Sequence, residues 1–142
     1  MKKNLLYLFA CLFIMSLTVA CGEDEFDFKG TILNPIENVE IKNGNVIYTV
    51  DSGEAAEIFY YNFVDGKLDN VKAEVHYKEK KLADIAYSAF ESLGAEGKEL
   101  MTVKKDGKVL KIDYKKESEE FSYYEGFTAQ QLADILNGEF SW

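Results

Sequence analysis

The sequence predicts a two-layer α+β domain in which an antiparallel sheet of three β-hairpins packs against two helices. Asn43-Gly44, Asp65-Gly66 and Asp106-Gly107 each separate two alternating segments, and such dipeptides favour tight hairpin turns. Apolar residues recur at helical spacing after the second hairpin, and a helix-start signature follows the third. The predicted order of elements is ββββ-α-ββ-α, which is typical of a sheet with helices that cover its apolar face.

The first and third hairpins alternate apolar and polar residues with a period of two. With two-residue turns, this alternation places one apolar set of each hairpin on a single face. The opposite face of the third hairpin is polar, so we expect the sheet to be buried on one side. The predicted inward residues are Val39, Ile41, Val46, Tyr48 and Val50 in the first hairpin, and Met101, Val103, Leu110, Ile112 and Tyr114 in the third.

The middle hairpin is apolar on both predicted faces near its turn. One face is predicted to carry Ile58, Tyr60, Val71, Ala73 and Val75. Aromatic side chains on a rigid strand offer a large amphipathic area at low entropic cost, which suits a sugar ring or a protein partner. The other face therefore provides the candidate binding patch of Phe59, Tyr61, Phe63 and Leu68. The alternative is that the second predicted helix or the C-terminal Phe140-Ser141-Trp142 covers this patch.

Two segments have the pattern of amphipathic helices. The first, with Gly94 as its stop signal, carries an apolar stripe formed by Leu82, Ile85, Ala86, Ala89, Phe90 and Leu93. The second begins at Thr128 and ends before Gly138. Thr128 and Gln131 form a capping box, in which the side chain of each residue accepts a hydrogen bond from the backbone N–H of the other.

The composition limits the size and the partners of the domain. A chain of 142 residues fits one domain. All 25 acidic residues follow residue 20 while Lys2 and Lys3 precede it, so the remainder carries a formal charge of -11. Such a charge repels nucleic acid. The chain contains no arginine, so anions would meet lysine point charges rather than a bidentate fork.

The sequence contains no recognisable catalytic or metal-binding constellation, so we expect a non-catalytic protein without a cofactor. His76 is the single histidine, and we expect it to face solvent beside Glu74 and Lys72. No Gly-x-Ser-x-Gly elbow presents a serine nucleophile, and one histidine without a free thiol does not form a zinc site. Among 25 acidic residues some pair of carboxylates is bound to lie close together, so such a pair does not by itself indicate a glycoside hydrolase.

The first twenty residues are typical of a secretory signal. Lys2 and Lys3 precede Leu5–Ala20, an apolar run of about sixteen residues, which is shorter than the roughly 20 residues of a membrane-spanning helix. The run ends in Leu17-Thr18-Val19-Ala20-Cys21, a segment that resembles the lipobox of bacterial lipoproteins. The resemblance implies cleavage before Cys21 and attachment of lipid, such as palmitate, to that cysteine. The alternative is an uncleaved N-terminal anchor.

The residues after Cys21 are acidic. Gly22-Glu23-Asp24-Glu25-Phe26-Asp27 resembles the surface-export tag of Bacteroidota lipoproteins, which implies display on the outside of the outer membrane. A solvated spacer is the alternative, and the sequence leaves open whether the domain faces the periplasm or the exterior. We therefore expect a signal peptide at 1–20, a lipidated cysteine and acidic tether at 21–35, and one globular domain at 36–142.

The hypothesis that best fits these features is a cell-envelope lipoprotein that acts as a binding or accessory module for a glycan or protein. Its membrane partner is the bilayer reached through the lipid on Cys21. Two alternatives remain at this point. The first is a small enzyme or enzyme inhibitor acting on envelope glycans or proteins, which requires a cleft with converging acids of raised pKa. The second is a structural component of an envelope assembly, joined through an open sheet edge.

Overall fold

The computed structural model describes residues 26–138, which hold six strands and four helices. The two longest strands form the middle hairpin, and the two longest helices are the two that the sequence predicts. The strands are β1 (Ile36–Lys42), β2 (Asn45–Asp51), β3 (Ala55–Val64), β4 (Lys67–Tyr77), β5 (Met101–Asp106) and β6 (Val109–Tyr114). The helices are α2 (Lys80–Glu91), α3 (Gly94–Leu100), α4 (Glu119–Ser122) and α5 (Ala129–Leu136).

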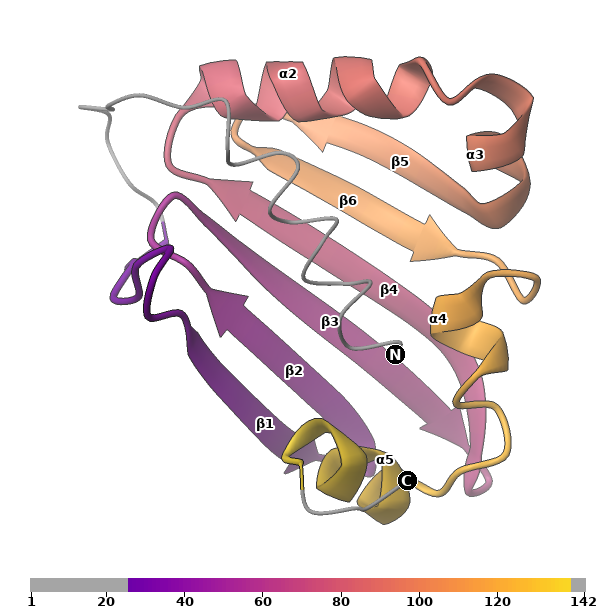
Figure 1. Cartoon of the computed structure of the whole chain (residues 1–142). Helices are drawn as coiled ribbons and strands as arrows, with labels where there is room; N and C mark the ends of the chain where they lie inside the picture. The colour runs from indigo at the N-terminus through magenta and orange to yellow at the C-terminus, as the bar shows by residue number, and fades with distance from the viewer. Residues whose placement is uncertain (1–25, 139–142) are drawn as a thin grey trace.

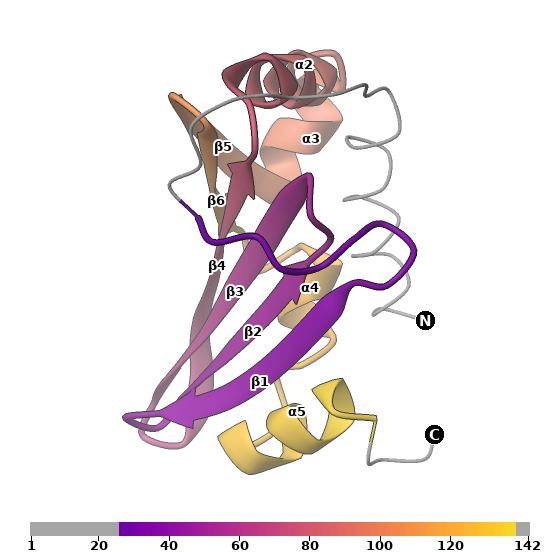
Figure 2. The same ribbon diagram turned by 90° about the vertical axis from the view of Figure 1, so that its left-hand side faces the viewer.

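The strands form one antiparallel sheet in the order β1-β2-β3-β4-β6-β5. β1 to β4 follow one another as a meander, and the chain then passes through α2 and α3 to the far edge before β6 returns beside β4 (Figure 1). Figure 2 shows α3, α4 and α5 on the same side of the sheet. The fold is therefore the predicted two-layer α+β architecture, with one face of the sheet toward the helices.

The tight turns form where the sequence predicts them. Asn43 and Gly44 have φ of 54° and 80°, and Asp65 and Gly66 have φ of 52° and 78°, as a type I′ turn requires. The third turn differs by one residue, because Asp106 pairs with Val109 and the turn consists of Gly107 and Lys108. The faces of the third hairpin are nevertheless as predicted, and its five inward residues are buried.

Phe59, Tyr61, Phe63 and Leu68 share a face as predicted, but the predicted face of Val71, Ala73 and Val75 is wrong because β4 contains a β-bulge. Phe63 pairs with Leu68, but Asn62 pairs with Asn70, so Asp69 is an extra residue. The Asn62 amide donates to Asn70 Oδ1 at 2.8 Å across the bulge. One extra residue inverts all later side chains. Consequently Val71, Ala73 and Val75 join Phe59 and Tyr61 on the helix side, opposite Ile58 and Tyr60.

The predicted binding patch lies in the core and offers no open surface. Phe59 and Tyr61 are fully buried, Leu68 is 6% exposed, and Phe63 is half-buried against the same core. The ring of Tyr61 meets the edge of Tyr124, with centroids 5.7 Å apart. The segment around α4 and α5 thus covers these residues.

The two predicted helices form with their predicted ends. α2 stops before Gly94, which has φ of 65°, and Thr128 and Gln131 make both hydrogen bonds of the capping box at α5. α3 and α4 were not predicted, because each is too short to show an apolar period. Ser118 caps the start of α4, and its hydroxyl accepts the Phe121 N–H.

The folded part of the chain begins before the predicted boundary at Ile36. Asp51, at the end of β2, is 6% exposed and accepts the backbone N–H groups of Lys29 and Gly30 at 2.6 and 3.1 Å. Gly30 lies so close to the sheet that a Cβ there would be 1.9 Å from the Asp51 carbonyl oxygen. Residues 28–30 are therefore attached to the sheet, and residues 31–34 form an exposed turn between them and β1.

Candidate binding site on the open face of the sheet

The face of the sheet turned away from the helices is where polar and apolar side chains remain accessible. We call this the open face. Its central residues alternate along each strand with the buried core residues, which fixes their direction. They are Ile47 and Thr49 on β2, Ile58 and Tyr60 on β3, Lys72 and Glu74 on β4, Lys111 and Asp113 on β6, and Thr102 and Lys104 on β5.

The open face contains a groove with a volume of about 420 Å³ that crosses β3, β4, β6 and β5. Half-buried Tyr60 lies at its β3 side, and three exposed lysines and two carboxylates are among the residues that line the rest. The groove is lined by Tyr60, Asn62, Lys72, Ala73, Glu74, Thr102, Lys104, Lys111, Ile112 and Asp113. This volume is in the range of pockets that bind small molecules.

The lysines in the groove repel one another. Lys104 and Lys111 lie directly opposite across the β5–β6 ladder, and like charges in that position destabilise a sheet. Lys111 is 3.9 Å from Asp106, and both of these side chains are largely exposed, so this contact compensates little. Across the β4–β6 ladder Lys72 lies opposite Asp113 and Lys111 lies opposite Glu74, although Lys72 and Lys104 form no ion pair within residues 26–138. In this part of the chain Lys104 is thus the groove lysine that faces another lysine and has no carboxylate within ion-pair distance. An anion placed between these lysines would relieve the repulsion.

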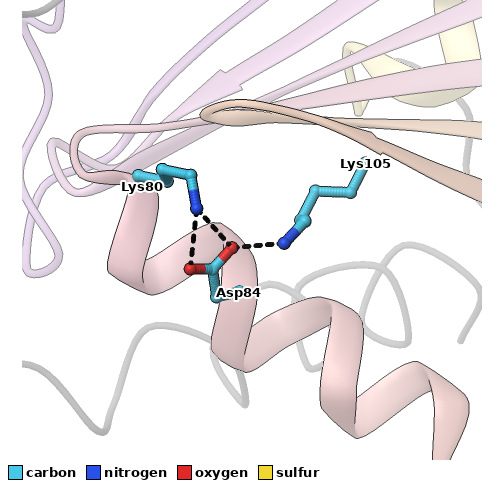
Figure 3. Close-up of polar contacts among 3 residues, drawn as sticks. All are labelled: Lys80, Asp84 and Lys105. Atoms are coloured by element: carbon cyan, nitrogen blue, oxygen red, sulfur yellow. Dashed lines mark hydrogen bonds and ion pairs between the residues drawn. The ribbon is translucent and has the colours of Figure 1, made fainter.

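The neighbouring lysine of the same strand is used differently. Lys105 faces the helix side, where its ammonium lies 2.5 Å from Asp84 of α2 and 5.9 Å from the centre of the Tyr87 ring. Lys80 also contacts Asp84, at 3.1 Å (Figure 3). Hydrogen bonds from Lys105 and then Lys80 lower the pKa of the Asp84 carboxyl. Lys105 therefore connects α2 to the edge strand, whereas Lys104 is available to a ligand.

Tyr60 and His76 flank the polar part of the open face. Partial burial, and secondarily the charge of Glu74, raises the pKa of the Tyr60 hydroxyl, so Tyr60 stays a neutral donor with an accessible ring. His76 faces this side with Lys72 and Glu74, as predicted. Its Nε2 is 3.0 Å from Glu74 Oε1, and its ring lies 5.6 Å from that of Phe26. His76 is therefore held by its neighbours.

A second group of ionisable residues lies inside the core. Glu57 of β3 is 3% exposed, and burial, with a smaller effect of Glu120, raises its pKa to about 8. The nearby hydroxyls of Tyr61 and Tyr77 are buried and have no hydrogen-bond partner within residues 26–138, and burial raises the pKa of both tyrosines. Because the Glu57 carboxyl is separated from solvent, its perturbed pKa affects stability rather than a substrate.

The sequence did not identify the open face as the site. The feature that could have indicated this site is the row of lysines at alternate polar positions of β4, β5 and β6, a pattern that also predicts an ordinary solvated face. Cys21 lies outside the described residues.

Among the described residues no cluster of three or more metal-binding side chains occurs, and no helix among them has the length and apolar character needed to cross a membrane. Comparison with protein-family models, curated proteins and solved structures finds no match for this chain.

Proposed function

We propose that this protein is a lipid-anchored binding module of the bacterial cell envelope, and that its open face binds an acidic glycan. The observation that carries the proposal is the groove of about 420 Å³, in which the ring of Tyr60 lies beside three lysines that outnumber the two carboxylates of the lining. The anchor follows from the resemblance of Leu17–Cys21 to a lipobox. The membrane then holds the open face where envelope polymers are concentrated.

An acidic glycan fits both components of the groove. A sugar ring packs on the face of a tyrosine, whose neutral hydroxyl donates to sugar oxygens. Carboxylate or sulfate groups of the next residues would lie near Lys104 and Lys111, whose mutual repulsion they would reduce. The remainder of the protein is acidic, with a formal charge of -9 for the whole chain. Attraction of an anion is therefore local to this groove.

Removing two charges from the groove should weaken binding of an acidic polysaccharide about tenfold, because each exposed charge contact contributes up to about 1 kcal/mol. We expect this result for the double variant Lys104→Gln/Lys111→Gln, measured by biolayer interferometry on polygalacturonate. Raising the salt concentration should reduce the difference, since exposed charges are screened. The methyl ester of the same polymer should bind weakly to both proteins.

The matched control is Lys81→Gln/Lys98→Gln, which removes the same charge from exposed positions on α2 and α3. Its affinity should equal that of the wild type. Equal weakening in both double variants would show a general charge effect and would contradict a site on the open face. Tight binding of the neutral ester, insensitive to either double variant, would retain a binding module but exclude an acidic ligand.

A further inference from the structure

The turn that precedes β1 exposes two adjacent large apolar side chains. Leu33 is 90% exposed and Ile32 is 51% exposed. The turn is closed at both ends, because the Asn34 N–H donates to Thr31 Oγ1 at 3.0 Å and the Thr31 N–H donates to the Asn34 carbonyl at 3.1 Å. The two side chains are therefore presented on a fixed backbone, at the cost of their exposure to water.

The base of this turn is attached to the sheet. Asp51 accepts hydrogen bonds from Lys29 and Gly30 just before the turn, and from Gly53 at 2.9 Å just across from it. A hollow of about 460 Å³ between these segments is lined in part by Ile32 and Leu33. The position of the exposed pair relative to the sheet is thus set by a buried carboxylate.

The turn is also close in sequence to Cys21. Phe26 is five positions after Cys21, and its ring lies 4.9 Å from that of Phe28 on the folded part. A fully extended chain of five residues spans at most about 18 Å. If lipid on Cys21 is in a bilayer, the end of the sheet that carries this turn lies next to that bilayer.

We infer that Ile32 and Leu33 insert into the interfacial layer of the membrane that holds the lipid on Cys21. This inference rests on the proposed lipid anchor. Two apolar side chains do not hold a free domain on a bilayer, but a tethered domain needs little additional energy to prefer one orientation. Insertion orients β1 to β4 away from the membrane, so that the turns at Asn43-Gly44 and Asp65-Gly66 point outward.

A fluorescence quenching experiment on the full lipidated chain tests this contact. Leu33→Cys, in a Cys11→Ser background, is labelled with a polarity-sensitive fluorophore, and the protein is reconstituted into phosphatidylcholine vesicles with or without brominated acyl chains. The matched control is Val64→Cys, which is 55% exposed at the opposite end of β3. We expect bromine to quench the label at position 33 by about half and to leave the label at position 64 unchanged.

Each other outcome overturns the inference in a different way. Equal quenching at both positions would indicate that the domain has no fixed orientation. A blue-shifted emission at position 33 without bromine quenching would show that a protein surface covers the turn. Failure of the unlabelled wild type to float with vesicles would remove the proposed anchor itself. Flotation without quenching would retain the anchor and exclude the contact.

Discussion

Replacing Glu57 with glutamine should stabilise the protein at pH 8 by about 4 kcal/mol, as expected from a carboxyl whose pKa rises from 4.5 to about 8 on folding. The raised pKa means that the folded state binds the proton more tightly than the unfolded state. The contribution of this proton to stability is complete below pH 4.5 and is lost as the pH rises through 8. Glutamine has the shape of the protonated acid and loses nothing over this range.

Urea denaturation at intervals from pH 5 to pH 9 measures this effect. The free energy of unfolding of the wild type should fall as the pH rises, whereas that of Glu57→Gln should change much less. The control is Glu40→Gln, because Glu40 is exposed on β1 and its replacement should leave the pH dependence unchanged. A wild type with constant stability over this range would contradict the assignment of Glu57 as a buried, neutral acid.

Asp51→Ala should lower the free energy of unfolding by about 3 kcal/mol, because hydrogen bonds from backbone groups to a carboxylate contribute roughly 1.5–3 kcal/mol each and water replaces part of the loss. The Asp51 side chain accepts three backbone N–H groups, from Lys29, Gly30 and Gly53. Alanine leaves all three without this acceptor, and that of Gly30 is buried. The segment before β1 should then separate from the sheet.

Asp51→Asn is the graded comparison for this variant. Its amide keeps one oxygen acceptor but turns an NH₂ group toward a backbone donor, so its loss of stability should be intermediate. Urea denaturation measures the stability, and hydrogen exchange of the Lys29 and Gly30 amides measures attachment of the segment. Unchanged protection of these amides in Asp51→Ala would contradict the role of Asp51 in holding residues 28–30.

The parts of the fold that the sequence predicts are those encoded by local chemistry. Asn43-Gly44 and Asp65-Gly66 adopt positive φ at little cost, so both turns formed as expected. The capping box at Thr128 and the glycine after α2 mark helix ends for the same reason. Alternation then assigned the faces of the third hairpin and of β2 correctly, whereas Ile41 of the outermost strand β1, predicted to be inward, is 44% exposed.

The errors have a tertiary origin. Nothing in the alternation of β4 reveals the extra residue at Asp69, and one inserted residue was enough to assign Val71, Ala73 and Val75 to the wrong face. The predicted aromatic patch failed because exposure depends on what covers a face. Tyr124 and the helices beside it come from the far end of the chain, and sequence alone does not place them over Tyr61.

The groove on the open face also depends on tertiary structure that the sequence does not reveal. The sequence correctly predicted a polar face on the third hairpin, including Lys104 and Lys111, but it did not indicate that β6 returns next to β4. That topology brings Lys72 and Tyr60 beside the two lysines and creates the groove. A binding site assembled from four strands therefore becomes visible once the order of the strands is known.

Metabolic labelling with a palmitate analogue tests the central claim, lipid attachment at Cys21, most directly. The labelled band of the wild-type chain expressed in a Gram-negative host should sediment with outer membranes. Cys21→Ser should abolish both the label and the sedimentation, because no other residue of the lipobox carries a thiol. A Cys21→Ser chain that keeps the label, or an unlabelled wild type that is released as a free protein, would contradict a lipid-anchored binding module.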